Sequence, residues 1–397
     1  MSTHSLLPPP IEAGEHSDRL QHYLGKLIKD AGGWIGFDRY METVLYAPGL
    51  GYYSAGARKF GAGGDFVTAP EISPLFSRVV AGQCAEIFAQ LGDEPLVILE
   101  LGAGSGAMAA EILRELDRRH CLPDRYEILE ISADLRQRQR ARLEQEIPGL
   151  LSRVVWLDEL PNSSWVGVIL ANEVLDALPV KRFMRTADAW QELGVALTDG
   201  DQLTDAYRPA DDQLHTALQQ LQGQLPWPLP TGYVSEINPP LPVWLSGVVE
   251  KLARGLVLWI DYGYARHEYY HPERSQGTLM CHYRHHAHPD PYWWPGLQDI
   301  TAWVDFTAVA EAGLSCQMEL QGYTTQAHFL LAGGLEACLA QAMTGQTVED
   351  YPLAQQVKRL VMPGEMGERF KVMALGRGVS PPSGFSLRDL RDKLWPA

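Results

Sequence analysis

The stretch ILELGAGSGAM, residues 98–108, decides the fold expected for this chain. It begins as a short apolar run, carries an acid at Glu100, and then places Gly102, Gly104 and Gly106 within five residues. Glycine tolerates a left-handed backbone and lets a ligand approach the main chain closely. A strand, a glycine-rich turn and a helix in succession form the nucleotide-binding corner of open parallel sheets. The stretch therefore predicts a nucleotide-cofactor site.

Short apolar runs alternate with helical patterns on both sides of this turn. The runs predicted as strands are 96–101, 126–132, 153–157, 165–175, 255–264, 316–324 and 369–378. The patterns predicted as helices are 73–91, 105–119, 133–147, 305–313 and 325–361. This alternation is typical of strands that lie parallel. The sequence therefore predicts an α/β fold with a Rossmann-like, mostly parallel sheet and helices on both faces.

Acidic residues near successive strand ends bear on the choice between two cofactor classes. A dinucleotide fingerprint, G-x-G-x-x-G or A, is satisfied by Ala107, whereas ELGAGSG matches the acid-then-G-x-G-x-G pattern of S-adenosylmethionine (SAM) sites throughout. Glu130 follows Gly102 by 28 residues, beyond the roughly 20 expected of a dinucleotide fold. Asp158 and Glu159 follow the third strand, where an acid can meet the adenine amino group.

These acids favour SAM. Its two ribose hydroxyls, exocyclic amine and cationic tail suit carboxylates, which would repel a pyrophosphate. The competing interpretation is a tight strand-to-helix turn with incidental acids. The residues predicted to bind SAM from this part of the chain are Glu100, Gly102, Ala103, Gly104, Gly106, Glu130, Asp158, Glu159 and Asn172.

The composition restricts the class of protein. The chain has 397 residues and a formal net charge of −16, which argues against a nucleic-acid partner and is compatible with a basic protein target. The five cysteines are scattered without a C-x-x-C, which indicates a reducing compartment and no structural zinc. We find neither an apolar run long enough for a membrane span nor a signal or transit pattern at the start. We therefore expect a cytoplasmic protein.

Seven blocks of sequence resemble the MidA-like family of SAM-dependent methyltransferases. They are GDFVTAPEISPLF (64–76), ELGAGSG (100–106), ANEVLDALPVKRF (171–183), IDYGY (260–264), GTLMCHYRHHAH (277–288), PGLQDITAWVDFTA (295–308) and GYTTQAHFLL (322–331). They follow one another in the expected order over most of the chain. Trp303 departs from the family pattern, which has a histidine there.

The resemblance implies a class I methyltransferase sheet with added regions. The family includes a mitochondrial complex I assembly factor associated with symmetric dimethylation of an arginine on a complex I subunit. A protein substrate, and a respiratory complex subunit in particular, is thus one implication. We expect four segments: an N-terminal helical and loop substrate region (1–95), a SAM-binding core (96–182), an insertion (183–253), and the rest of the core with substrate loops and C-terminal helices (254–397). Within them, residues 1–17 are expected to be a flexible arm and 265–300 a His- and Trp-rich loop.

An arginine acceptor requires acids, because a guanidinium is protonated at ordinary pH and is a poor nucleophile. Carboxylates that hold its planar fork can leave one nitrogen facing the methyl group. Glu173 and Asp176 follow the fourth strand, where the acceptor pocket of such a sheet lies, and they are predicted to face the same way on a turn that enters a helix. Asn172 is predicted to orient the acceptor or a cofactor amine. The alternative is that the pair only caps the following helix.

The remaining candidates come from three loops. In GGDFVTAPEIS, Asp65, Thr68, Glu71 and Ser73 are predicted to cover cofactor and substrate. The alternative is that Pro70 and Ser73 only start the next helix. In HYRHHAH, His285 is predicted either to accept the released proton or to be a structural loop residue, and the histidine spacing does not favour a metal site. The further predicted substrate contacts are Asp261, Tyr262 and Glu236.

Three rival functions remain open from the sequence. A small-molecule methyltransferase would share the cofactor site, although the large added regions favour a macromolecular acceptor. A SAM-binding assembly factor with little catalysis would have little reason to carry Glu173 and Asp176. A nicotinamide dehydrogenase is the third, and failure to bind NADH would eliminate it.

Overall fold

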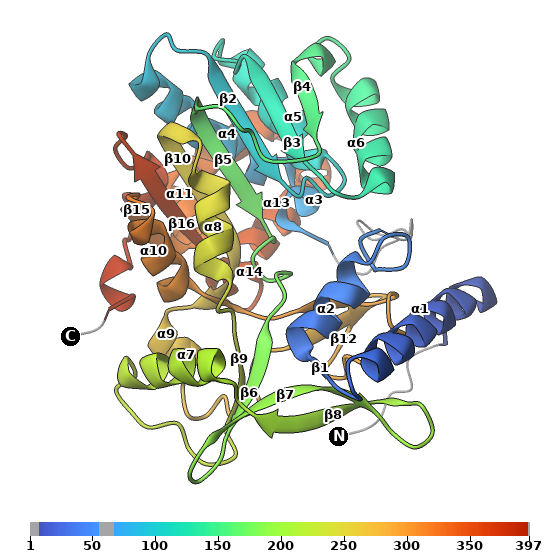
Figure 1. Cartoon of the computed structure of the whole chain (residues 1–397). Coiled ribbons are helices and arrows are strands. Elements are labelled where there is room, and N and C mark those ends of the chain that lie inside the picture. Colours follow the sequence, from blue (N-terminus) through green and yellow to red (C-terminus); the bar gives the residue numbers. More distant parts are fainter. Residues whose placement is uncertain (1–7, 55–66, 396–397) are drawn as a thin grey trace. The chain divides into compact units, whose positions relative to one another are not determined.

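The structure is a computed structural model that describes residues 8–54 and 67–395 (Figure 1). The chain divides into two compact units, each assembled from separate stretches of sequence. Unit 1 contains the described residues up to Ser54 together with 176–239 and 267–303. Unit 2 contains 67–175, 240–266 and the residues from 304 onward. Each unit has a buried apolar core of its own.

Among the described residues, eight strands form the central sheet of unit 2, seven of them in the order β15-β16-β10-β5-β2-β3-β4. Their bounds are β2 (Leu96–Leu101), β3 (Arg125–Leu129), β4 (Val154–Leu157), β5 (Trp165–Asn172), β10 (Leu252–Tyr264), β15 (Glu319–Thr325) and β16 (Phe370–Arg377), and β14 (Val304–Asp305) pairs with β10. The neighbouring strands in the series β10-β5-β2-β3-β4 run parallel, whereas β16 runs antiparallel to both β10 and β15. The predicted mostly parallel sheet is confirmed.

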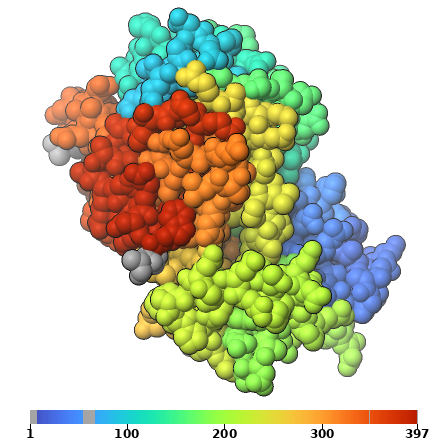
Figure 2. Space-filling model, turned by 60° about the vertical axis from the view of Figure 1, so that its left-hand side comes forward, coloured from blue at the N-terminus to red at the C-terminus, as the bar shows by residue number. Residues whose placement is uncertain are grey.

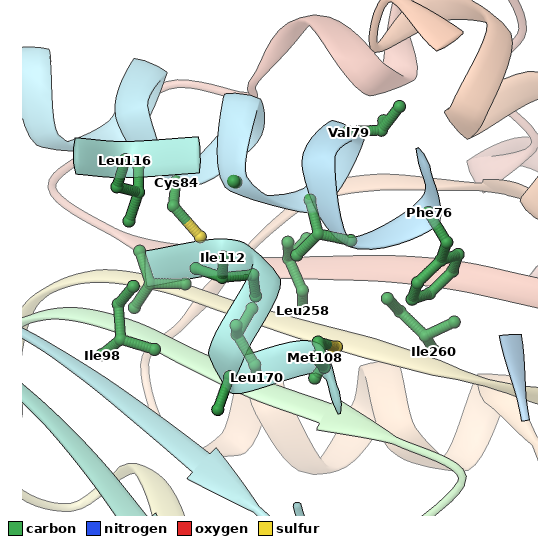
Figure 3. Packing of buried hydrophobic residues seen from close by; sticks show 14 of the residues in the cluster. Phe76, Val79, Cys84, Ile98, Met108, Ile112, Leu116, Leu170, Leu258 and Ile260 are labelled. Atoms are coloured by element: carbon green, nitrogen blue, oxygen red, sulfur yellow. The ribbon is translucent and has the colours of Figure 1, made fainter. Parts of the chain in front are cut away.

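One face of this sheet packs against a layer of helices. The layer contains α4 (Pro74–Leu91), α5 (Ala107–Arg118), α6 (Ala133–Glu146), α11 (Gln326–Ala332), α12 (Leu335–Ala342) and α13 (Thr347–Val361). Figure 3 shows side chains of α4 and α5, such as Val79 and Ile112, over Leu170 and Leu258 of the strands. Each large aliphatic side chain buried in this way contributes roughly 1.5–3 kcal/mol. The packing fixes β2 and the helix that follows it on either side of the glycine turn.

The opposite face packs against α8 (Leu241–Val249) and α10 (Phe306–Ser315). Trp244 of α8 lies with its ring centroid 5.9 Å from that of Trp259, which points away from Leu258 because side chains alternate along a strand. Figure 2 shows the yellow residues of α8 alongside the orange residues of α10. The predicted helices on both faces are thus confirmed. Three shorter elements, α3 (Ala69–Ile72), α14 (Met366–Arg369) and η1 (Leu151–Arg153), complete the connections near these layers.

Unit 1 is built on antiparallel strands. Its larger sheet has the order β1-β7-β6-β9, with β8 on β7, and its smaller sheet has the order β12-β11-β13. The bounds are β1 (Ile35–Gly36), β6 (Lys181–Arg185), β7 (Trp190–Leu197), β8 (Leu203–Pro209), β9 (Val234–Ile237), β11 (Met280–Tyr283), β12 (His286–His288) and β13 (Asp299–Thr301). The helices are α1 (Ile11–Asp30), α2 (Phe37–Tyr46) and α7 (Asp212–Gly223), and α9 (Arg266–Tyr269) crosses the boundary with unit 2.

Two expectations about this unit are corrected. Residues 11–17 are the start of α1 rather than part of a flexible arm, because Leu20, Leu24 and Ile28 form a buried stripe that anchors a longer helix. The segment 265–300 is not an irregular loop, since it supplies β11, β12 and β13. The two units also divide the chain differently from the four expected segments: β6 to β9 belong to unit 1, whereas α8 returns to unit 2.

Candidate active site

The glycine turn after β2 has the backbone that the sequence predicts for a cofactor corner. Gly102, Gly104 and Gly106 have φ angles of 63°, 54° and 83°, a left-handed region that other residues adopt only with strain. Gly106 is the N-cap of α5, and its backbone N–H donates to the Ala103 carbonyl at 2.8 Å. The turn is therefore a tight strand-to-helix connection whose main chain is not covered by side chains of its own.

Glu130 lies beside this turn, just after β3. Leu129 of β3 pairs with Leu101 of β2, and the Gly102 N–H donates to the Leu129 carbonyl at 3.1 Å, so the ends of the two strands are held together. The Glu130 side chain is 5% exposed and accepts hydrogen bonds from the Ser132 N–H at 2.9 Å and Gln139 Nε2 at 3.1 Å. This is the place that the sequence predicts for an acid on the ribose hydroxyls.

Asp158 and Glu159 follow β4, the next parallel strand. Both side chains are exposed, and Asp158 pairs with Arg136 Nη1 at 2.7 Å. The strand order therefore brings the predicted acids at or just after the ends of β2, β3 and β4 to one edge of the sheet. Their degrees of burial differ sharply, however, and an exposed ion pair such as Asp158–Arg136 contributes little to stability.

Glu100 is buried at the end of β2 rather than exposed in the turn. It is 1% exposed, and its carboxylate accepts a hydrogen bond from the Tyr126 hydroxyl at 2.8 Å. Burial raises the pKa of Glu100 to about 7, with a smaller contribution from the neighbouring Glu130 and an opposing one from the Tyr126 hydrogen bond. Glu100 thus titrates near neutral pH directly beneath the glycine turn.

The segment before α4 contacts the glycine turn through one polar cluster. The Ser105 hydroxyl donates to Glu71 of α3, and Arg142 Nη1 of α6 donates to both Glu71 Oε1 at 2.9 Å and Ser105 Oγ at 2.7 Å. Ser73 is buried as the N-cap of α4 and accepts from the Leu75 N–H, which agrees with the alternative that it starts the helix. Thr68 is the N-cap residue of α3 without a side-chain capping bond. Asp65 lies outside the described residues.

Glu173 follows β5 in a strained conformation. Its φ angle is 54°, and its side chain accepts from Asn172 Nδ2 at 3.2 Å. No helix follows in this described part of the chain, since residues 173–180 form turns before β6. The predicted turn into a helix is wrong, and helix capping is therefore not what these acids do. Strain at a non-glycine residue is typical of functional sites.

Asp261 holds the same turn from β10. One carboxylate oxygen accepts from the N–H groups of Val174 at 3.2 Å and Leu175 at 2.9 Å, and the other accepts from the Tyr262 N–H at 2.9 Å. Asp261 is 1% exposed. Asp261 is predicted to touch substrate, but in the structure both of its carboxylate oxygens accept hydrogen bonds from backbone N–H groups. Tyr262 packs with its ring centroid 5.4 Å from that of Phe370.

Asp176 belongs to unit 1, where it is buried near a second carboxylate that the sequence analysis missed. The Asp176 carbonyl accepts from the Ala302 N–H at 3.0 Å. Asp299 is 3% exposed and accepts from the Tyr53 hydroxyl at 3.0 Å. Burial, with smaller effects of Asp299 and Asp176, raises the pKa of Tyr53, so the three groups share one environment. Asp299 lies in the block that resembles the family, which was the available signal.

Glu236 and His285 occupy contrasting places in unit 1. Glu236 is 1% exposed and its carboxylate accepts from the Thr278 N–H at 2.8 Å and hydroxyl at 3.0 Å, so it ties β9 to the segment before β11. Arg284 and His285 are the exposed two-residue turn between β11 and β12, and both have positive φ angles, as this kind of hairpin requires. The Arg274 guanidinium carbon lies over the ring of Trp303, 5.0 Å from the centroid of that ring.

The sequence analysis also missed Gln139 and Arg142 of α6. This helix is so polar that it carries almost no amphipathic signal, yet Leu135, Gln139 and Leu143 are its buried residues. Their spacing of four marks one helix face. A polar residue in the middle of such a stripe was the signal that could have identified Gln139.

The described residues at this edge of unit 2 fit SAM. Left-handed glycines leave the main chain accessible, and Glu130 is an oriented acceptor for hydroxyl groups. Glu100, Glu130 and Asp158 stand in the order that the prediction requires. The role of each residue stays a prediction, whereas the class of site is tested by known proteins.

Three comparisons bear on that class. Residues 79–324 match the family described as "putative S-adenosyl-L-methionine-dependent methyltransferase". A Burkholderia thailandensis structure described as a "likely methyl transferase", bound to S-adenosyl-homocysteine, is 44% identical with a TM-score of 0.92 and covers 98% of this chain and 99% of its own. A second structure from the same organism is 43% identical with a TM-score of 0.90.

Animal relatives extend the match at lower identity. The Caenorhabditis elegans "Protein arginine methyltransferase NDUFAF7 homolog, mitochondrial" is 26% identical over 93% of this chain and 89% of the relative. The Mus musculus "Protein arginine methyltransferase NDUFAF7, mitochondrial" is 27% identical over 92% of this chain and 86% of the relative.

The mitochondrial names of these relatives contradict the cytoplasmic location expected above. That expectation rested on the first residues and on composition, and the physical chemistry of a folded domain does not encode its compartment. No helix in the described ranges combines the length and apolarity needed to cross a bilayer.

The match to the family model over most of the chain and the S-adenosyl-homocysteine bound in a close structural neighbour confirm the predicted cofactor class. The chain belongs to the family of putative S-adenosyl-L-methionine-dependent methyltransferases, and SAM is its cofactor.

Proposed function

We propose that this enzyme transfers a methyl group from SAM to a side-chain nitrogen of an arginine in a protein substrate. Relatives matched over about nine-tenths of the chain carry the name protein arginine methyltransferase. The observation within the molecule that supports the proposal best is Glu173, an acid held at a φ angle of 54° directly after β5. An acid in a strained backbone is retained where its direction matters more than its local energy.

Bound SAM supplies an electrophilic methyl group on a sulfonium. The residues of this chain would then bind and orient the acceptor, because most of the catalysis of an in-line displacement is positioning. Glu173 would hold the guanidinium fork, with Asp176 as a second carboxylate, and draw its positive charge away from the nitrogen that reacts. Asn172 donates to Glu173 and fixes its direction. His285 is the proposed acceptor of the released proton, and its exposed place in the hairpin turn gives that proton a path to solvent.

The proposed cofactor ligands lie at the edge of unit 2. The glycine turn would receive the cofactor against its main chain. Glu130 would accept from the ribose hydroxyls, and Asp158 or Glu159 from the adenine amine. The Glu100 carboxylate would attract the cationic amino-acid tail of SAM. Glu71, with Thr68 and Ser73 on the same segment, would border the site through the contact of Glu71 with Ser105.

We propose that unit 1 supplies further contacts to the protein substrate. The acids of this unit that we propose for substrate recognition are Asp176, Asp299 and Glu236. We further propose that the substrate is a subunit of a respiratory complex, with assembly of complex I as the process, because the resemblance that predicts the fold also implies this substrate. Asp261 and Tyr262 would act on the substrate through the turn that Asp261 holds.

The test is methyl transfer by matched variants. Purified wild type, Glu173→Gln and the control Glu250→Gln would be incubated with tritiated SAM and a respiratory-complex fraction from cells that lack the enzyme. Glu250 is an exposed glutamate of the same unit, paired only with its neighbour Lys251 among the contacts found. We expect the Glu173 variant to lose transfer by about 100-fold or more, with S-adenosylhomocysteine (SAH) affinity within about threefold of wild type.

Hydrolysis of the labelled protein identifies the product. Radioactive methylarginine in wild type and in Glu250→Gln supports the proposal. Label in lysine or in small molecules, or equal transfer by Glu173→Gln, would overturn the arginine assignment. SAH binding without transfer to any fraction would favour the assembly factor instead.

A further inference from the structure

Gln139 is a fully buried amide in α6, a mostly polar helix whose other buried residues are Leu135 and Leu143. The exposed fraction of Gln139 is 0%. Nε2 donates to the Gly104 carbonyl at 3.0 Å and to Glu130 Oε2 at 3.1 Å, while Oε1 accepts from Trp156 Nε1 at 2.9 Å. Burying an amide is costly unless its donors and acceptor are satisfied. Both N–H donors and the carbonyl oxygen of Gln139 have such partners.

The chemistry of these partners fixes which way the amide faces. The indole N–H of Trp156 can only donate, so the Gln139 oxygen must point toward it. The Gly104 carbonyl and the Glu130 carboxylate can only accept, so the NH₂ group must point toward them. The reverse orientation would lose all three hydrogen bonds. Trp156 therefore fixes the orientation of the Gln139 amide, and the Gln139 amide in turn holds the Gly104 carbonyl and the Glu130 carboxylate.

Glu130 is held at both oxygens as a result. Oε1 accepts from the Ser132 N–H at 2.9 Å and Oε2 accepts from Gln139. A side chain fixed in this way loses little conformational entropy when it binds a ligand. The same amide also holds the Gly104 carbonyl, and a Cβ on Gly106 would lie 3.4 Å from the Gln139 Cα, so α6 packs tightly against the turn.

We propose that Gln139 is a positioning residue of the cofactor site. It orients the Glu130 carboxylate toward the ribose hydroxyls of SAM and fixes the position of the glycine turn relative to that carboxylate. The inference rests on the proposed role of Glu130 as the ribose ligand. Gln139 does not touch the cofactor in this scheme. Through its hydrogen bonds it links Trp156 of β4 to Gly104, which follows β2, and to Glu130, which follows β3.

A purely structural role and a positioning role differ in one measurable quantity. Either role predicts some loss of stability when Gln139 is removed. Only the positioning role predicts that the enzyme becomes less able to distinguish a ribose with hydroxyls from one without them. A general weakening of the site would lower affinity for both ligands by the same factor.

The experiment is calorimetric titration with SAH and with an SAH analogue that lacks the 2′ and 3′ hydroxyls. The proteins are wild type, Gln139→Leu and the matched control Gln326→Leu. Gln326 is also a 0% exposed glutamine of unit 2, and its Nε2 donates to the Leu360 carbonyl at 2.9 Å. We expect wild type and Gln326→Leu to prefer SAH by about tenfold or more, since hydrogen bonds to a charged acceptor are strong. In Gln139→Leu this preference should fall at least threefold.

Two further variants keep the test decisive if Gln139→Leu does not fold. Trp156→Phe removes the donor that orients the amide while it keeps an aromatic ring, and the preference for SAH should again fall. Gln139→Glu places a second carboxylate beside Glu130, so SAH binding should be weak at pH 8 and recover toward pH 5, where the new acid can donate a proton. Wild type should show no comparable recovery.

The outcomes separate the two layers of the argument. If wild type binds both ligands equally, Glu130 is not the ribose ligand and the proposed cofactor placement fails. If wild type prefers SAH and the Gln139 or Trp156 variants keep the full preference, the placement stands and the positioning role of Gln139 is overturned. A preference that falls in Gln139→Leu and equally in Gln326→Leu also overturns it.

Discussion

Glu173 shows how a single residue can carry strain that its neighbours maintain. A left-handed backbone costs an L-residue roughly 1–2 kcal/mol, and glycine escapes this cost. Glu173 has a φ angle of 54°, and its N–H nevertheless donates to the Ile260 carbonyl at 2.9 Å. A hydrogen bond to β10 thus holds Glu173 in a backbone conformation that is unfavourable for this residue by itself.

We predict that Glu173→Gly is more stable than Glu173→Ala by about 1 kcal/mol, although both lack the carboxylate. The comparison removes side-chain contacts from the result, because both variants lose them. Urea denaturation midpoints measure the difference. Both variants should be inactive in methyl transfer. An alanine variant at least as stable as the glycine variant would show that the backbone is not strained there.

Glu100 predicts a pH dependence of stability. Burial raises its pKa from an ordinary 4.5 to about 7. Because the native state disfavours the charged form, Glu100 imposes no penalty below pH 4.5, an increasing penalty between pH 4.5 and 7, and a constant one above. Glu100→Gln keeps an acceptor for Tyr126 without the charge. Its free energy of unfolding should therefore rise relative to wild type by an amount on the order of 3 kcal/mol from pH 4.5 to 8.

Denaturant titrations at four pH values between 4.5 and 8 measure this change. The control is Glu250→Gln, whose difference from wild type should not vary across the range, since Glu250 is exposed. Parallel pH profiles for wild type and Glu100→Gln would contradict a raised pKa.

Among the elements, the turn after β5 depends on a neighbouring strand rather than on its own sequence. Asp261 of β10 accepts from two backbone N–H groups of that turn. We predict that Asp261→Ala lowers the free energy of unfolding by about 2–4 kcal/mol, because it leaves these buried donors unpaired. Asp261→Asn keeps one acceptor oxygen and should lose less than half as much. Thermal and urea unfolding measure both, and an alanine variant with an unchanged midpoint would contradict the role.

The strands and helices of unit 2 follow closely from the sequence, because a buried strand is a short apolar run and a helix repeats every 3.6 residues. The predicted run 96–101 coincides with β2 (Leu96–Leu101), and the predicted helix 133–147 with α6 (Ala133–Glu146). The segment 265–300 could not be predicted in the same way. Its strands are three or four residues long, too short for a periodic pattern to be recognised, and they form only through pairing with one another.

For the whole molecule, the two cores predict two unfolding events. The core of unit 1 contains Leu24 and Val195, whereas that of unit 2 contains Ile98 and Leu258. SAH should stabilise unit 2 selectively, by about 2.7 kcal/mol at a concentration 100 times its dissociation constant. Calorimetry should therefore resolve a transition that SAH shifts and another that it does not. Hydrogen exchange would assign them, with 98–108 and 126–142 protected by SAH and 190–209 unaffected.

The control for this prediction is Gly104→Val, since a branched side chain does not tolerate the φ angle of 54° at that position. SAH should shift neither transition in this variant. A single transition in wild type that SAH moves as a whole would contradict independent cores.

The sequence by itself determined the parallel sheet, the glycine turn and the cofactor class, because these depend on local periodicity and on residues that lie close together in the chain. The family followed from the resemblance of seven sequence blocks. Only the tertiary structure decided that Glu100 is buried, that Asp261 faces the backbone of another strand, and that Gln139 supports Glu130. Those facts depend on contacts between residues that are 9 to 86 positions apart in the chain. No local pattern specifies such contacts, since they follow from the packing of strands and helices that are separate in the sequence.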